Sequence, residues 1–101
     1  MIVESTISDD GRILTITITG RFDILGHACF SQSYNDKLES VSTIVIDMIN
    51  VESIDSAALG LLFVLWKKAM ENKAEVILSN CNPDVKKAVQ VVRFDKLFKL
   101  V

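Results

Sequence analysis

One stretch of this chain, TIVIDMINVESIDSAALG (Thr43 to Gly60), constrains its fold more than any other. Residues Ile44–Ile46 are β-branched and would be apolar on both faces of a strand, which is typical of a central strand in a parallel sheet. A polar connection follows, and Asp55 and Ser56 then open an apolar segment with helical spacing. Because parallel strands must be joined by crossovers, this order predicts an α/β fold.

The remaining segments extend this pattern. The chain from Ile2 to Ile7, then Leu14–Thr19 and Glu75–Ser79, are predicted strands, and Asp9-Asp10-Gly11 predicts a hairpin between the first two. Gly20 is expected to end the second strand. Helices are predicted over Leu25–Leu38, Ser56–Asn72 and Pro83–Val92, the last one capped by Asn82. The final RFDKLFKLV predicts a helical turn leading into a last edge strand. We expect a mixed sheet with an N-terminal hairpin, a central Ile44–Ile46 strand and helices packed mainly on one side.

Length and charge narrow the classes of protein. A chain of 101 residues predicts one domain spanning residues 1–101. The formal net charge of −2 argues against nucleic acid or an anionic membrane as partner. The apolar run Ala57–Trp66 falls short of the about 20 residues that span a bilayer. The N-terminus lacks a secretory pattern, so we expect a cytoplasmic protein.

Residues for metal or covalent chemistry are scarce. His27 is the only histidine, and no cluster of further histidines or cysteines accompanies it as zinc ligands. A Ser-His-Asp triad would have to use His27, but the sequence has no G-x-S-x-G turn to supply the nucleophile. The sequence therefore predicts no enzyme activity, no metal and no cofactor. Cys29 and Cys81 form a disulfide or are small buried hydrophobic residues, and the second interpretation is the more typical of a chain without a secretory signal.

The helix beginning at Ser56 has two interpretations. Five apolar side chains recur at helical spacing and are expected to face the core: Leu59, Leu62, Phe63, Trp66 and Met70. Leu61 and Leu65 fall toward another face. Either the helix is buried widely against the sheet and a neighbouring helix, or Ala57, Ala58 and Leu61 form an exposed apolar patch for a partner.

Ser56 itself has two interpretations. It is either an ordinary N-cap or a phosphorylation site, because a helix N-terminus presents free N–H groups and tolerates an added anion. Asp55 is expected to cap the helix, with positioning of the hydroxyl or help to a partner kinase in removing its proton as the alternatives. Asp23, in the Gly20-Arg21-Phe22-Asp23 turn, is predicted to lie near Ser56, since parallel strands bring their carboxyl ends together.

Five motifs in order resemble the STAS-domain family, and within it the single-domain bacterial anti-sigma factor antagonists. They are Gly20-Arg21-Phe22-Asp23, Ile44-Val45-Ile46-Asp47, Ile54-Asp55-Ser56-Ala57-Ala58-Leu59-Gly60, Pro83-Asp84-Val85-Lys86-Lys87 and Phe94-Asp95-Lys96-Leu97-Phe98. The resemblance implies a partner-switching protein that binds a kinase-type anti-sigma factor, or a related serine kinase, when it is unphosphorylated. The kinase inactivates it with ATP, and a PP2C-type phosphatase restores it.

By this resemblance the phosphorylated serine, which directly follows the Asp of the D-S motif, is Ser56. The expected partner-binding residues are Arg21, Asp23, Asp55, Ser56, Ala57, Ala58 and Leu61. A non-switching STAS adaptor, such as a small subunit bound to a transport complex, is the alternative. A small-ligand sensor is a third hypothesis, for which no ligand-specific constellation is visible.

The chain departs from the family pattern at three places. Ala58 and Arg93 stand where the family usually has glycine, and the methyl group of Ala58 is expected to alter the surface beside the phosphorylation site. The chain also stops at Val101, earlier than many relatives, so the last helix of the family is expected to be absent.

Overall fold

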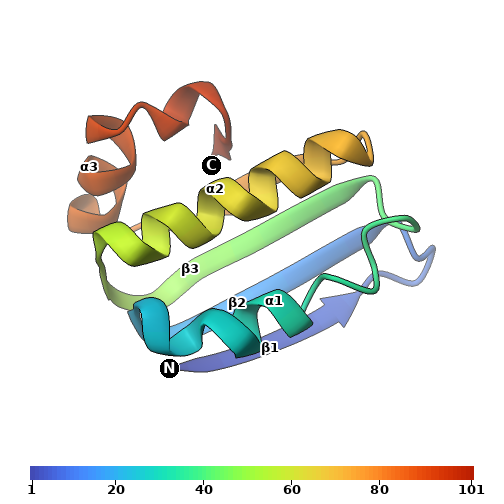
Figure 1. Ribbon diagram of the computed structural model, residues 1–101, viewed down its shortest axis with the longest axis horizontal. Helices are drawn as coiled ribbons and strands as arrows, with labels where there is room; N and C mark the ends of the chain where they lie inside the picture. Colours follow the sequence, from blue (N-terminus) through green and yellow to red (C-terminus); the bar gives the residue numbers. More distant parts are fainter.

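The computed structural model describes residues 1–101 as one mixed sheet with helices against it (Figure 1). In chain order the elements are β1 (Ile2–Ile7), β2 (Ile13–Phe22), the 3-10 helix η1 (Ile24–Gly26), α1 (His27–Gln32), β3 (Thr43–Ile54), α2 (Ser56–Glu71), β4 (Glu75–Ser79), α3 (Pro83–Val91), the 3-10 helix η2 (Phe94–Lys96) and β5 (Lys99–Leu100). None of the helices combines the length and the apolar character needed to cross a membrane.

The sheet has the strand order β1-β2-β3-β4-β5. β1 pairs antiparallel with β2, and every later pair is parallel. The N-terminal hairpin and the central position of Ile44–Ile46, in β3, are thus confirmed. Figure 1 shows α1 and α2 crossing the same face of the sheet, with α3 near the end where α2 begins. The predicted mixed sheet with helices mainly on one side is confirmed.

The core lies between this sheet face and the helices. Strand alternation places one set of side chains inward, and all of them are fully buried: Leu14, Ile16, Ile18, Ile44, Ile46 and Leu78. Thr15 and Thr17 alternate with them on the opposite, partly exposed face. Burying each aliphatic side chain contributes about 1.5–3 kcal/mol, so this layer is the main stabilising element.

The second strand is longer than expected. β2 continues through Gly20 to Phe22 because β3 runs on to Ile54 and offers it a partner. The prediction that Gly20 ends the strand was wrong. Gly20 has a φ of 96° and lies at a register shift in the β2–β3 ladder, so it is a bulge position and not a terminator. This extension carries Arg21 to the edge of the site described below.

The first helix is shorter than the predicted Leu25–Leu38. It opens with a 3-10 turn, is α-helical only from His27 to Gln32, and gives way to turns. The Ser33 hydroxyl donates to the Phe30 carbonyl oxygen at 2.5 Å, in competition with the helical ladder. Tyr34 is nevertheless buried, with only 1% of its surface exposed. The apolar pattern that predicted a longer helix therefore reflects burial of this residue in a turn.

The core face of α2 also differs from the prediction. The buried residues of this helix are Ala58, Leu61, Leu62, Leu65 and Ala69. Phe63 and Met70, which were expected inside, are 39% and 56% exposed. The helix is apolar almost all round, so its periodicity does not select one orientation. In the folded protein, the buried stripe of α2 begins at Ala58 and ends at Ala69.

The C-terminal segment and three single residues bear on further expectations from the sequence. The final segment forms η2 and the short edge strand β5, as predicted. Arg93 adopts a left-handed conformation with φ of 61°, which explains why glycine suits this position. Cys29 is exposed and Cys81 is partly buried, and both are free, so the prediction of burial was wrong for Cys29.

Candidate functional site

The ends of β2 and β3 bring together two segments that are far apart in sequence. Arg21 is in register with Ser53, and the Asp55 N–H donates to the Phe22 carbonyl oxygen at 3.4 Å. A cleft of about 310 Å³ lies between them, lined by Arg21, Phe22, Asp23, Ser53, Ile54 and Asp55. The prediction that Asp23 lies close to the start of the Ser56 helix is confirmed.

Asp55 caps α2. Its backbone is extended, with φ of −110° and ψ of 179°, and its carboxylate accepts from the Ala58 N–H at 2.9 Å. This is the geometry of an N-cap, and the negative charge also suits the positive end of the helix dipole. Ser56 is the first residue of the helix and is exposed. Its hydroxyl therefore does not have the capping role that one interpretation of the sequence gave it.

Asp23 has an equivalent role in the preceding turn. Its carboxylate accepts from the Leu25 N–H at 3.0 Å and caps η1. The side chain is partly buried, and its neighbour Arg21 is exposed. The two carboxylates of Asp23 and Asp55 thus fix the two turns that form the cleft walls. One basic and two acidic side chains surround the start of α2.

The predicted apolar patch on α2 is only partly present. Ala57 is partly exposed, but Ala58 and Leu61 are 0% and 8% exposed. Their assignment to an exposed partner surface was wrong, because the helix turns both side chains into the core. For the same reason the methyl group of Ala58 does not alter the surface beside Ser56.

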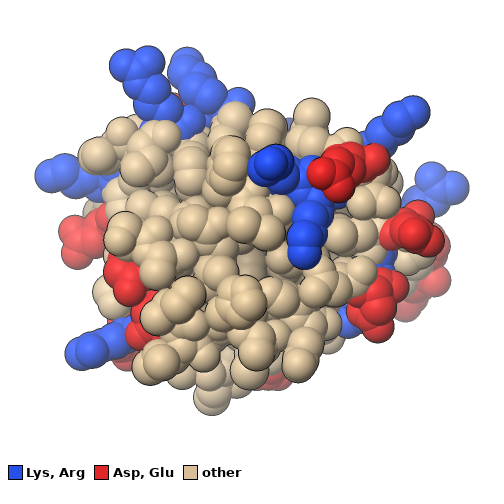
Figure 2. All heavy atoms as spheres, in the orientation of Figure 1, with Lys and Arg blue, Asp and Glu red and all other residues tan.

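Two exposed apolar residues that the sequence analysis missed lie next to Asp23. Ile24 and Leu25 are 55% and 88% exposed. Neither residues 24–35 nor residues 56–66 contain a Lys, Arg, Asp or Glu. Figure 2 shows the result, a broad area without charged side chains over α1 and the first part of α2. The sequence signal for this surface was the absence of charged residues over these two segments.

The STAS domain family model matches residues 5–101. A STAS-domain containing protein of Pseudomonas aeruginosa (strain UCBPP-PA14) is 37% identical over 100 residues, covering 99% of each chain. The chain therefore belongs to the STAS-domain family.

Solved structures place the fold beside anti-sigma factor antagonists. The antagonist SpoIIAA in its unphosphorylated form has a TM-score of 0.85 at 17% identity, covering 99% of this chain and 88% of that one. The Bacillus SpoIIAA is also solved in its phosphorylated form, with a TM-score of 0.71 at 17% identity and coverage of 99% and 91%. A sulfate transporter family protein from Wolinella succinogenes has a TM-score of 0.77 at 15% identity, covering 90% and 73%. At these identities the likeness shows the fold alone.

Proposed function

We propose that this chain is a phosphorylation-controlled partner-switching regulator of the cytoplasm. When Ser56 is unphosphorylated, the protein binds an anti-sigma factor or a related kinase-like regulator, and phosphorylation releases that partner. The protein is a binding module and not itself an enzyme. One observation carries the proposal: Ser56 is exposed at the first position of α2, while Asp55 caps the helix.

The site suits the chemistry of phosphoryl transfer by a partner kinase. The Ser56 oxygen attacks the γ-phosphorus of ATP, the bond from that phosphorus to the β–γ bridging oxygen breaks, and ADP leaves. The hydroxyl proton passes to a base of the kinase or to solvent. The product carries about 1.5–2 negative charges at pH 7. A helix N-terminus stabilises such an anion, so the domain remains folded after modification.

Phosphorylation then acts at the interface. The uncharged surface over η1, α1 and the start of α2 suits a partner through apolar contact, since interface cores are depleted of charge. A phosphate at its border must be desolvated when the partner binds, and it repels acidic groups of the partner. A loss of about 3 kcal/mol weakens binding roughly 100-fold, which is enough to switch a partner present near its dissociation constant.

The relatives support this proposal in two ways. The STAS domain covers almost the whole chain, and the neighbouring SpoIIAA is an anti-sigma factor antagonist with both unphosphorylated and phosphorylated structures. Ser56 also retains the exposure that a modifying kinase requires.

Titration with purified kinase-type partners tests the switch. We expect Ser56→Ala to remain folded, to gain no phosphate by intact mass in the presence of kinase and ATP, and to bind constitutively. Ser56→Asp should bind more weakly than wild type, although one carboxylate carries less charge than a phosphate. Equal affinities for wild type and both variants, with phosphate still incorporated elsewhere, would exclude Ser56 as the switch.

Variants of the cleft test the extent of the interface. Charge reversal at Arg21 should weaken binding while the thermal midpoint stays close to that of wild type, because its side chain is exposed. Charge reversal at Asp23 should also weaken binding and leave the domain folded, but with a lower thermal midpoint, because the Asp23 carboxylate caps η1. Leu25→Ser, at the most exposed apolar side chain, should also weaken binding. Lys87→Glu on α3 is the matched control, an exposed charge reversal outside the cleft. Unchanged binding by the Arg21 and Asp23 variants places the cleft outside the interface.

A second candidate function is a non-switching adaptor within a larger complex. The likeness to a sulfate transporter family protein favours it. In that case Ser56 stays unmodified, and the α2 surface is a permanent interface. Intact-mass analysis with candidate kinases distinguishes the two, since only the first candidate predicts incorporation of phosphate at Ser56.

A further inference from the structure

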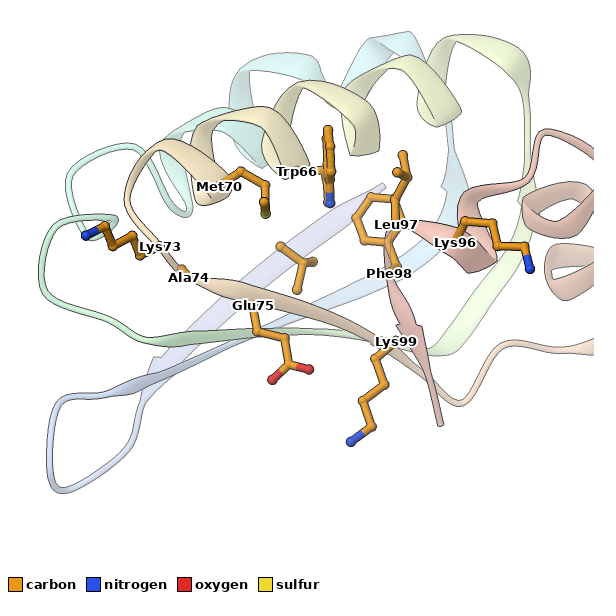
Figure 3. Close-up of a pocket in the computed structure, with 10 residues that line it drawn as sticks. Trp66, Met70, Lys73, Ala74, Glu75, Lys96, Leu97, Phe98 and Lys99 are labelled. Carbon is orange, nitrogen blue, oxygen red and sulfur yellow. The ribbon is translucent and has the colours of Figure 1, made fainter.

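A second hollow lies at the opposite end of α2 from Ser56. It has a volume of about 630 Å³ and lies between the C-terminal half of α2, the start of β4 and the η2–β5 segment. Figure 3 shows Trp66 and Met70 pointing toward it from α2, with the ring of Phe98 approaching from the C-terminal segment. At 1.5 Å per helical residue, Met70 is about 21 Å along the helix axis from Ser56. We call this hollow the α2–β5 groove.

The groove has an apolar floor with an aromatic wall. Met70 is 56% exposed although it borders buried Val76 and Phe98. Trp66 stacks on Phe63 with ring centroids 5.8 Å apart, and further aromatic rings continue from Phe63 toward the C-terminus. Exposed apolar surface of this kind marks binding grooves, and a flexible methionine adapts to the shape of an occupant. Covering the floor is therefore favourable.

The shape of the groove favours a polypeptide over a small molecule. β5 pairs only with Ile77 and Leu78, so the edge of β4 at Glu75 and Val76 extends beyond its partner strand. The groove is consequently open along one side. Small ligands are usually 70–90% enclosed by their sites, whereas amphipathic helices bind in open apolar grooves.

The charges around the groove indicate which sign of charge its occupant carries. Its charged lining residues are Lys73, Lys96, Lys99 and Glu75, so cations outnumber anions in a chain whose net charge is −2. In Figure 3 Lys73 lies at one end of the groove and Lys96 at the other, both directed away from the apolar floor. Glu75 and Lys99 point to the opposite side of the sheet. A helix with acidic residues beside its apolar stripe complements this arrangement.

A second copy of this chain is a poorer match. Its exposed amphipathic helix is α3, in which Val91 is 72% exposed. That helix carries Lys86 and Lys87 against the single acid Asp84, so its net charge has the same sign as the lysines around the groove. Like charges brought together at an interface weaken it.

We propose that the α2–β5 groove is a docking site for an amphipathic helix of a partner protein. The helix places apolar side chains at i, i+3 or i+4, and i+7 against Trp66 and Met70, and acidic side chains beside that stripe meet Lys73 and Lys96. This contact is separate from the Ser56 site. A partner that uses both sites is held at the two ends of one helix.

The chain contains its own reporter of occupancy, because Trp66 is the only tryptophan. The probe is a synthetic, end-capped helix of about 15 residues, near the minimum for helicity in water, with a leucine stripe, glutamate flanks and no tryptophan. We expect a saturable change in Trp66 emission on titration. The same peptide with lysine flanks should bind about tenfold more weakly, equivalent to 1.4 kcal/mol.

Variants of the protein locate the binding site. Met70→Asp replaces an exposed residue and should weaken peptide binding by about tenfold or more through loss of apolar contact. The double variant Lys73→Glu, Lys96→Glu should abolish the preference for glutamate flanks. The matched control Lys67→Glu, Lys87→Glu makes the same change of net charge at exposed sites outside the groove and should behave as wild type. Amide NMR spectra confirm that each variant is folded.

The outcomes separate this proposal from the Ser56 switch. Ser56→Asp should bind the peptide as wild type does, whatever it does to a kinase-type partner. The proposal is overturned if Trp66 does not respond, if both peptides bind equally, or if Met70→Asp has no effect. A tighter response to monomeric decanoate would instead indicate a lipid site. A dimer in sedimentation equilibrium that Met70→Asp dissociates would indicate a second copy of the chain.

Discussion

The assignment of Asp55 as the N-cap of α2 makes a quantitative prediction about two adjacent residues. The Asp55 carboxylate accepts from the Ala58 N–H at 2.9 Å, and no other side chain caps the helix. Replacement of such a cap by alanine costs about 1 kcal/mol, and loss of a negative charge at the helix N-terminus adds about 0.3–1 kcal/mol. We expect Asp55→Ala to lose about 1.5 kcal/mol of unfolding free energy in total.

Ser56→Ala should behave differently although it alters the next residue. Ser56 is exposed and is not the cap, so the expected change is within about 0.5 kcal/mol. Asp55→Asn keeps an oxygen acceptor and should retain most of the stability. Urea denaturation followed by circular dichroism measures the free energy of unfolding of all three variants. Thermal denaturation gives a second measurement, because each 1 kcal/mol shifts the thermal midpoint of a domain of this size by about 4–8 °C. If Ser56→Ala loses as much stability as Asp55→Ala, the cap assignment is incorrect, and the main support for Ser56 as a free phosphate acceptor is lost.

Three further predictions follow from single residues. Iodoacetamide at pH 8 should alkylate Cys29 before Cys81, as peptide mapping will show, because Cys29 is exposed while burial raises the pKa of the Cys81 thiol. Burial also raises the pKa of Tyr34 above its usual value of about 10. The neutral phenol therefore makes its full contribution to stability below about pH 10, and this contribution is lost as pH rises through the folded-state pKa. Phenylalanine does not titrate, so the free energy of unfolding of Tyr34→Phe should fall less between neutral and alkaline pH than that of wild type, as urea titrations will show. Arg93→Gly should raise the unfolding free energy by about 0.5–1 kcal/mol, since glycine adopts the left-handed conformation without the Cβ contact; a loss of stability would show that the Arg93 side chain makes a compensating contact.

The sequence by itself determined the order and type of the elements. The β-branched run Ile44–Ile46, the Asp55-Ser56 helix start and the Asn82-Pro83 start of α3 each depend on neighbouring residues, so local chemistry was sufficient to predict them. The meeting of Asp23 with the start of α2 also followed from sequence, because parallel strands bring their carboxyl ends to one edge.

Only the tertiary structure decided the orientation of α2 and the extent of β2. An almost uniformly apolar helix has no preferred face until it packs, so its periodicity did not reveal that Leu61 is buried while Phe63 and Met70 face outward. Likewise, Gly20 is a strand residue only because β3 extends alongside it. The exposed Leu25 and the α2–β5 groove have the same origin. They arise from contacts between segments distant in sequence, and the free energy of those contacts has no local signature.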